Sequence, residues 1–216
     1  MTIEKIISIN LAELTTLDYQ HKQVQTGIYK QAVNGPVAVH VEGLAGDIQV
    51  DRVNHGGPDK AIYVYSQDNY PYWEHYMQTP AFSPGQFGEN LTVSGMGDDV
   101  IHIGDIIQFG EVLTEVTQPR VPCFKLGIKM GDKSFVGTFL TSGRVGFYVR
   151  ILKTGHIRPG DTIERKNTGP SALTIRDAML ALVKGQRQQD VIRQALAIPA
   201  LSLAWRNDLE RRLRKD

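Results

Sequence analysis

The residues around the single cysteine of this chain favour a reactive thiol. Cys123 lies in the segment 118–126, which reads QPRVPCFKL. Each proline fixes its own φ, and Pro122 also restrains the residue before it, so the loop presents the thiol stiffly. Arg120 and Lys125 favour the thiolate, which is the form that attacks electrophiles and binds soft metals. The sequence therefore offers Cys123 as a nucleophile or as a metal ligand.

Two alternatives for Cys123 stay open from the loop alone. A free cysteine is commonly a small buried hydrophobic residue without a chemical role. As a nucleophile, Cys123 would need a base, and His55 is a candidate because such partners need only be close in space. That pairing would make the protein a cysteine hydrolase, but no acid that would orient His55 can be identified from the spacing.

Two further segments combine polar side chains with glycines at expected turns. Gly56 and Gly57 would let backbone N–H groups face a ligand, and Lys60 adds a point charge for an anion. In the segment 87–92, Glu89 and Asn90 offer an acceptor and a donor at a second turn. Both segments predict polar walls of a binding site, although ordinary polar turns would contain the same residue types.

Arg144 is the third candidate for anion binding. It lies between two glycines, where an expected helix gives way to an expected strand. The planar guanidinium suits a phosphate or a carboxylate, and such a junction can present it to a ligand. A surface ion pair is the alternative interpretation of the same arginine.

The composition excludes several classes of function. The chain has 24 Lys and Arg against 23 Asp and Glu, a net charge of +1, so no general attraction to nucleic acid or to an anionic membrane is expected. The histidines lack zinc-site spacing, and neither a GxGxxG nor a GxxxxGK[ST] motif is present. One cysteine cannot hold an iron–sulfur cluster. Electrons for a redox reaction would therefore have to come from another protein.

Cellular location can also be predicted from the sequence. A single cysteine suits a reducing compartment, and the N-terminal residues are too short and too acidic for a signal peptide. The sequence has no apolar run as long as a membrane span. We expect a cytoplasmic protein.

The candidate residues belong to a region that is predicted to be mainly β. Residues 1–167 contain short apolar or alternating runs separated by glycine-rich turns, which favours a strongly curved sheet and a closed or nearly closed barrel. The expected strands are 5–11, 37–41, 61–65, 101–109, 112–117, 147–152 and 162–164. Short helices are expected at 67–76, after Ser66, and at 134–142, before Gly143.

The remaining residues, 168–216, are predicted to form a small domain of three helices. Thr174 and Ser202 have the positions of helix N-caps, and apolar residues recur at helical spacing after each of them. A helix at 190–197 lies between. None of the three is long enough to be stable alone, so they should pack together or against the barrel as an accessory module.

Eight stretches of the chain resemble the MOSC family, named for the C-terminal domain of molybdenum cofactor sulfurases. They occur in the family's order along the chain and include HGGPDKA, GENLT, QPRVPCFKL and GRVGFYVR. They are residues 26–30, 43–47, 55–61, 70–73, 88–92, 118–126, 143–150 and 159–161. The resemblance is greatest to the small stand-alone bacterial branch that confers resistance to N-hydroxylaminopurines, in which a helical domain follows the barrel.

This resemblance implies a β-barrel that binds the molybdenum cofactor, with Cys123 as the thiolate ligand of molybdenum. The candidates for the cofactor's phosphate, pterin ring and polar edges are Arg120, Arg144, Lys60, His55, Gly56, Gly57, Glu89, Asn90 and Gln118. It implies reduction of N-hydroxylated bases, or related compounds, with electrons from a flavoprotein reductase. The alternative is a carrier of the cofactor, or of sulfur as a persulfide on Cys123. The chain departs from the sulfurases because it has no desulfurase domain, so pyridoxal phosphate is not expected here and a separate cysteine desulfurase would be a partner.

Overall fold

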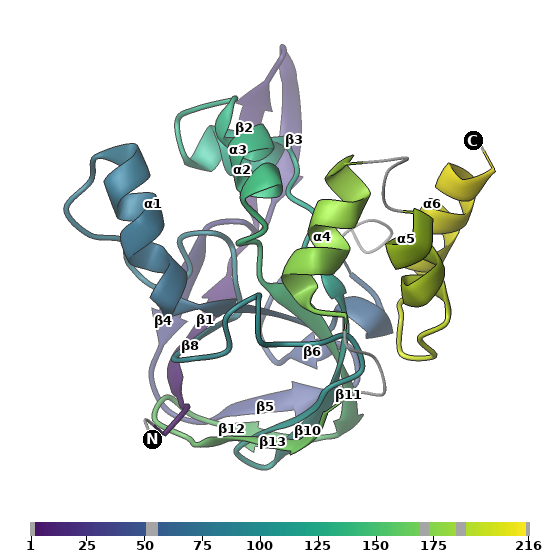
Figure 1. Cartoon of the computed structure of the whole chain (residues 1–216). Helices are drawn as coiled ribbons and strands as arrows, with labels where there is room; N and C mark the ends of the chain where they lie inside the picture. The colour runs from purple at the N-terminus through teal and green to yellow at the C-terminus, as the bar shows by residue number, and fades with distance from the viewer. Residues whose placement is uncertain (1–2, 51–55, 169–172, 185–188, 215–216) are drawn as a thin grey trace.

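The centre of the molecule is one curved eight-stranded sheet. The computed structural model describes residues 3–50, 56–168, 173–184 and 189–214. The strand order is β13-β9-β10-β11-β7-β8-β1-β4, and every neighbouring pair is antiparallel except β7 and β8 (Figure 1). These strands are β1 (Ile6–Ala12), β4 (Lys30–Val33), β7 (Ile62–Ser66), β8 (Leu91–Val93), β9 (Ile106–Phe109), β10 (Val112–Pro119), β11 (Phe147–Lys153) and β13 (Ile163–Asn167).

Two smaller sheets complete the β structure. Strands β12, β5 and β6 form a three-stranded sheet beside the large one, and β2 and β3 form a hairpin that projects from the body (Figure 1). Their bounds are β2 (Thr15–Tyr19), β3 (Lys22–Thr26), β5 (Val37–His40), β6 (Gly43–Leu44) and β12 (Gly155–Ile157). The hairpin lies against the α2 helix, where the rings of Tyr19 and Phe124 stack 4.5 Å apart.

The large sheet curls until its two sides touch, but it is not a closed barrel. Strand β4 pairs with only the second half of β1, Ile9–Ala12. The chain at the start of β1 instead meets the start of β13, where the Ile6 N–H donates to the Asp161 carbonyl at 3.0 Å. One isolated bridge, Lys5 to Thr162, joins the two sides. The mainly β prediction is confirmed, whereas strand pairing in the described residues does not run around a full ring.

The predicted strands occur in the structure with bounds that differ by a few residues, and one of them is confirmed only over its second half. The expected strand 101–109 begins only at Ile106. Ile101 and Ile103 are buried as the apolar pattern predicts, but Asp105 turns the chain between them and β9 by accepting a hydrogen bond from the His102 N–H at 2.9 Å. The apolar alternation at 101–105 therefore predicted the burial of these side chains correctly, but it wrongly predicted a strand there.

Short helices cover the sheet, at the predicted places except for η1 and α2, which were not predicted. They are η1 (Pro58–Lys60), η2 (Gln67–Asn69), α1 (Tyr70–Met77), α2 (Phe124–Lys129), α3 (Phe135–Ser142), α4 (Ile175–Lys184), α5 (Gln189–Leu196) and α6 (Leu203–Leu213). The predicted caps are confirmed: Thr174 Oγ1 accepts from the Asp177 N–H at 3.0 Å, and Ser202 Oγ accepts from the Trp205 N–H at 3.1 Å. None of the described helices is long and apolar enough to cross a membrane.

The three C-terminal helices share one hydrophobic core with the sheet. Leu173, Ile175, Met179 and Trp205 are buried in the same cluster as the strands and the aromatic residues of α1 and α3. Figure 1 shows α4 between α3 and the pair α5 and α6. Because the core is continuous, the helices stabilise the sheet as well as one another.

Hydrogen bonds also cross from these helices to the sheet region. The Ser202 N–H donates to the Thr117 carbonyl at 3.2 Å, and the Leu203 N–H donates to Asp59 Oδ2 at 3.1 Å. The Arg150 guanidinium donates to the Ala200 carbonyl at 3.0 Å. The start of α6 is thereby fixed to the end of β10 and to η1. The division of the chain at residue 167 stays a prediction, but the two parts are closely joined.

Deleting residues 168–216 is expected to destabilise the sheet strongly. Truncation exposes apolar side chains that these helices cover. Each fully buried side chain that becomes exposed lowers the free energy of unfolding by about 1.5–3 kcal/mol. We expect an insoluble chain, or one without a cooperative thermal transition followed by circular dichroism. Leu203→Ala, at a side chain that is 66% exposed, is the control and should unfold like the wild type. A truncated chain that unfolds cooperatively at the wild-type temperature would show that the helices are an independent module.

Candidate functional site

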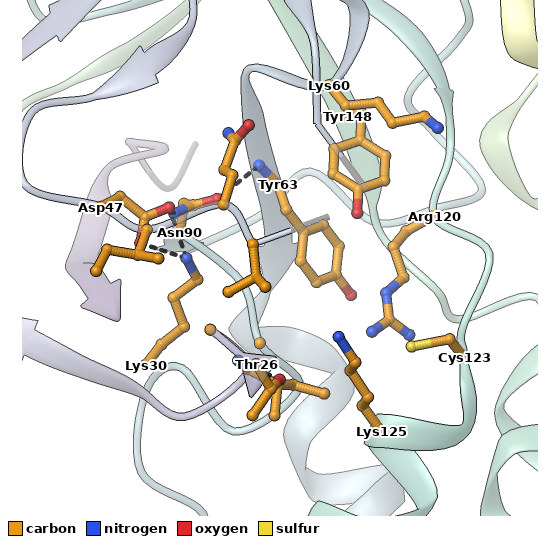
Figure 2. A pocket seen from close by; sticks show the side chains of 16 residues that line it. Thr26, Lys30, Asp47, Lys60, Tyr63, Asn90, Arg120, Cys123, Lys125 and Tyr148 are labelled. Atoms are coloured by element: carbon orange, nitrogen blue, oxygen red, sulfur yellow. Dashed lines mark hydrogen bonds and ion pairs between the residues drawn. The ribbon is translucent and has the colours of Figure 1, made fainter. Parts of the chain in front are cut away.

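A pocket opens beside Cys123 at the end of the sheet from which β10 leads into α2 (Figure 2). Six separate parts of the chain supply its walls, so the fold gathers residues that are far apart in sequence. The lining residues are Thr26, Gly27, Ile28, Lys30, Asp47, Ile48, Gln49, Val50, Lys60, Tyr63, Gly88, Asn90, Arg120, Cys123, Lys125 and Tyr148.

Arg120 is a buried cation next to the thiol. Its residue is only 5% exposed, and its guanidinium lies 5.3 Å from the ring centre of Tyr63 and 5.8 Å from that of Phe139. Figure 2 shows the guanidinium beside the sulfur of Cys123. Its Nη1 is fully buried and has no hydrogen-bond partner in the described part of the chain. An unpaired buried donor costs about 1–3 kcal/mol, so a ligand that accepts from Nη1 would be stabilised there.

Two further cations face the same pocket. Lys60 is the last residue of η1 and is 8% exposed, and Lys125 lies in the first turn of α2. Lys125 donates from Nζ to the Gln25 carbonyl at 2.9 Å, which holds its amine at the pocket. With Arg120 these side chains make this wall strongly positive, as an anionic ligand requires.

The opposite wall is a buried polar network around Asp47. Lys30 Nζ lies 2.5 and 2.6 Å from the two Asp47 oxygens, and Asn90 Nδ2 donates to Asp47 at 2.8 Å. Burial lowers the pKa of Lys30, and the charge of Asp47 opposes that effect. Asn90 Oδ1 accepts from the Tyr63 N–H at 3.1 Å. This network fixes the pocket wall and leaves the positive charge concentrated on the side of Cys123.

Two tyrosines stand between the walls as neutral groups. Burial raises the pKa of both Tyr63 and Tyr148, and the positive charge of Arg120 opposes the increase only in part. Both phenols therefore stay protonated at neutral pH. The Tyr63 hydroxyl donates to the Val145 carbonyl at 2.8 Å. In Figure 2 the Tyr148 hydroxyl points toward the Arg120 guanidinium and the thiol.

The structure brings together five of the residues selected from the sequence: Cys123, Arg120, Lys125, Lys60 and Asn90. Glu89 is completely buried behind the pocket wall. Its carboxylate accepts hydrogen bonds from the Tyr70 hydroxyl, from the Thr92 hydroxyl at 3.0 Å and from backbone N–H groups of the preceding turn. Burial raises the pKa of Glu89 despite these bonds. Glu89 thus shapes the turn that carries Asn90 without lining the pocket.

Arg144 and the glycines before η1 also lie elsewhere. Arg144 donates from Nη1 to Asn69 Oδ1 at 2.8 Å and lies 4.8 Å from the ring centre of Tyr72, on the side of α1. Gly56 and Gly57 are described by the structure but do not line this pocket. His55 lies outside the described residues, and with it the predicted pairing of His55 and Cys123. Gln118 lines a neighbouring hollow and accepts a hydrogen bond from the Ser202 hydroxyl at 2.6 Å.

Reasoning from single residues missed Lys30 and Asp47. Both occur in the stretches 26–30 and 43–47 that carry the family resemblance, and this was the available signal. A Lys and an Asp seventeen residues apart give no local pattern. The pairing of β1 with β4 sets Lys30 opposite Ala12, whose N–H donates to Asp47 Oδ1 at 2.9 Å, and so brings Lys30 to the wall that Asp47 and Asn90 share.

Two family models match most of the chain. A MOSC domain model matches residues 51–164, and a YiiM-like, 3-alpha helix domain model matches residues 173–216. YflK of Bacillus subtilis is 38% identical, over 93% of this chain and 90% of that protein. Protein YiiM of Escherichia coli is 30% identical, over 87% of this chain and 84% of that protein. A protein of Gibberella moniliformis named as a reductase is 39% identical over 65% of this chain, which spans 26% of that protein.

Solved structures agree with these matches. The crystal structure of YiiM from Geobacillus stearothermophilus superposes with a TM-score of 0.81 at 34% identity, covering 97% of this chain and 99% of that one. The crystal structure of YiiM from Escherichia coli superposes with a TM-score of 0.76 at 28% identity, covering 87% of this chain and 90% of that one. The predicted resemblance is confirmed: this chain belongs to the MOSC domain family, and its C-terminal region is a YiiM-like three-helix domain.

Proposed function

We propose that this protein binds the molybdenum cofactor in the pocket at Cys123 and reduces N-hydroxylated compounds with it. The observation that carries the proposal is the buried, unpartnered Nη1 of Arg120 beside the only thiol of the chain. The MOSC family is associated with this cofactor. A relative named as a reductase shares part of the chain, which supports an oxidoreductase.

The residues present fit the chemical groups of the cofactor. The cofactor has a dithiolene-bound metal, a pterin ring with hydrogen-bonding edges and a phosphate, so it needs a soft ligand, polar partners and cations. Cys123 would supply the thiolate, and Arg120, Lys60 and Lys125 the positive charge. Asn90 lies on the polar wall across the pocket. Glu89 would contribute through the turn that carries Asn90, whereas Arg144 lies away from this pocket and has no part in holding the cofactor.

The reaction breaks one N–O bond. An N-hydroxylated amine takes up two electrons and two protons and gives the amine and water. When bound, the cofactor supplies the two-electron transfer, and a separate flavoprotein reductase is the proposed source of the electrons. Tyr148 would donate a hydrogen bond to the departing oxygen, because its hydroxyl lies toward the thiol and its raised pKa keeps it protonated, and the two protons would come from solvent.

Molybdenum and pterin analysis of protein made in cells that synthesise the cofactor tests the binding. We expect molybdenum and pterin in equimolar amounts with the wild-type chain and much less in Arg120→Ala, because a guanidinium–anion hydrogen bond contributes about 1.5–3 kcal/mol.

Arg144→Ala is the matched control, since it removes a guanidinium that does not line the pocket. It should keep the wild-type content of molybdenum and pterin. Equal contents in all three proteins would contradict the role of Arg120. A wild-type chain without molybdenum would contradict the proposed function itself.

A further inference from the structure

We propose that the substrate binds in a second hollow on the other side of Cys123, where the polar face of α6 recognises its ring. This inference rests on the proposed function and deepens it. The hollow has a volume of about 560 Å³, within the usual range for small-molecule sites. Its lining residues are Lys60, Gln118, Val121, Pro122, Cys123, Tyr148, Ala204, Trp205, Asn207, Asp208 and Arg211.

Three residues line both this hollow and the proposed cofactor pocket: Cys123, Lys60 and Tyr148. A molecule in the hollow therefore reaches the same thiol and the same phenol as a group in the pocket, but from another direction. Such an arrangement is what a reductase needs, because the bond to be broken must lie beside both the metal ligand and a group that can hydrogen-bond the departing oxygen. The two hollows together form one site with two compartments.

The α6 wall of the hollow is a polar stripe of the helix. Ala204, Asn207, Asp208 and Arg211 have the spacing of one helix face, and all four are exposed. The neighbouring Leu209 is 1% exposed and packs in the core. The side of α6 that does not pack into the core thus faces the hollow.

These side chains suit a flat heteroaromatic ring that carries both donors and acceptors. Asn207 can donate and accept at adjacent ring positions, as asparagine does with the edge of adenine, and the Asp208 carboxylate can accept from an amino group. Arg211 forms an ion pair with Asp208, which orients the carboxylate. Val121 and Pro122 give the hollow apolar surface for the ring faces. These contacts suit the ring edge of an N-hydroxylated base, the substrate class that the proposed function already includes, and they assign its recognition to Asn207 and Asp208.

The wall is rigidly placed relative to the reactive groups. The Ser202 hydroxyl, at the start of α6, donates to Gln118 Oε1 at 2.6 Å, five residues before Cys123. The Leu203 N–H donates to Asp59, the neighbour of Lys60. The side chains of Gln118 and Asp59 are thus hydrogen-bonded to the start of α6. The fold therefore sets the distance between the ring-binding face of α6 and the thiol of Cys123. The C-terminal helices then determine which substrates fit.

Calorimetric titration of the cofactor-loaded full chain with an N-hydroxylated purine, without an electron donor, tests the inference independently of turnover. Asn207→Ala and Asp208→Ala should each raise the Kd about two- to tenfold, the effect of one lost hydrogen bond. Molybdenum content should stay at the wild-type level. Arg214→Ala, at the C-cap of the same helix and outside the hollow, is the control and should bind like the wild type.

A small ring-free substrate separates recognition from chemistry. Both α6 variants should lose much less kcat/KM for N-hydroxyurea than for the N-hydroxylated purine, since N-hydroxyurea has no ring edge to bind, and Arg214→Ala should reduce both compounds like the wild type. Wild-type purine binding in both variants, or no purine binding by the loaded wild type, would overturn the inference. Failure of the loaded wild type to reduce either compound would instead overturn the proposed function.

Discussion

Replacing Cys123 with alanine is expected to remove the bound molybdenum and abolish reduction, while the protein stays folded. Alanine offers no donor atom to a metal. Cys123 is only half-buried and lies in the loop before α2, outside the hydrophobic core, so its loss should hardly change the thermal transition. Removing residues that merely support a metal ligand often costs 10- to 100-fold, so loss of the ligand should lower turnover by at least about 100-fold.

Cys123→Ser serves as the matched variant. Serine keeps the size and shape of the side chain but replaces a soft sulfur by a hard oxygen, so it should retain at most a small part of the metal and the activity. Elemental analysis, circular dichroism and turnover are measured on the same preparations. Undiminished turnover by folded Cys123→Ala would contradict the assignment of Cys123 as the ligand.

The reactive side of the site could be predicted from local sequence. Two prolines and two cations around one cysteine are visible within nine residues, and the structure places Arg120 and Lys125 beside Cys123 in one pocket. Lys60 could also be selected from local sequence, because it follows a glycine-rich turn. Local composition was informative here because one loop supplies both the thiol and its nearest cations.

The roles of Glu89 and Arg144 could not be predicted in this way. Glu89 is bound by the Tyr70 hydroxyl, and Arg144 is held by Asn69, seventy-five residues away in sequence. Their hydrogen-bonding capacity is used by distant partners that no spacing rule identifies. A polar residue in a suggestive motif can therefore be a structural support, and only the fold decides which it is.

The fold shows the same division between local and distant information. Helix caps at Ser66, Thr174 and Ser202 are local signals, and all three are confirmed. The α2 helix was missed because it has six residues and follows a proline-rich loop, so no helical period is visible. The incomplete barrel and the shared core depend on contacts between segments far apart in sequence, such as Lys5 with Thr162.

Reduction of an N-hydroxylated purine is expected to depend completely on an added electron-donating protein. The sequence has neither a Rossmann fingerprint nor ligands for an iron–sulfur cluster, and its one cysteine is the proposed metal ligand. The loaded protein alone should therefore not reduce an N-hydroxylated purine with a nicotinamide donor. Adding a flavoprotein reductase should start conversion to the amine, because the flavin accepts the hydride and passes the electrons on. Cells that lack the protein should become more sensitive to N-hydroxylated purines.

The central claim is tested most directly by following that conversion in the complete system. The assay contains the molybdenum-loaded chain, a flavoprotein reductase, a nicotinamide donor and an N-hydroxylated purine, with Cys123→Ala in a parallel sample. The account predicts formation of the aminopurine by the wild type only, and only when the reductase is present. No conversion by a fully loaded wild-type chain would contradict it and would favour a carrier of the cofactor or of sulfur.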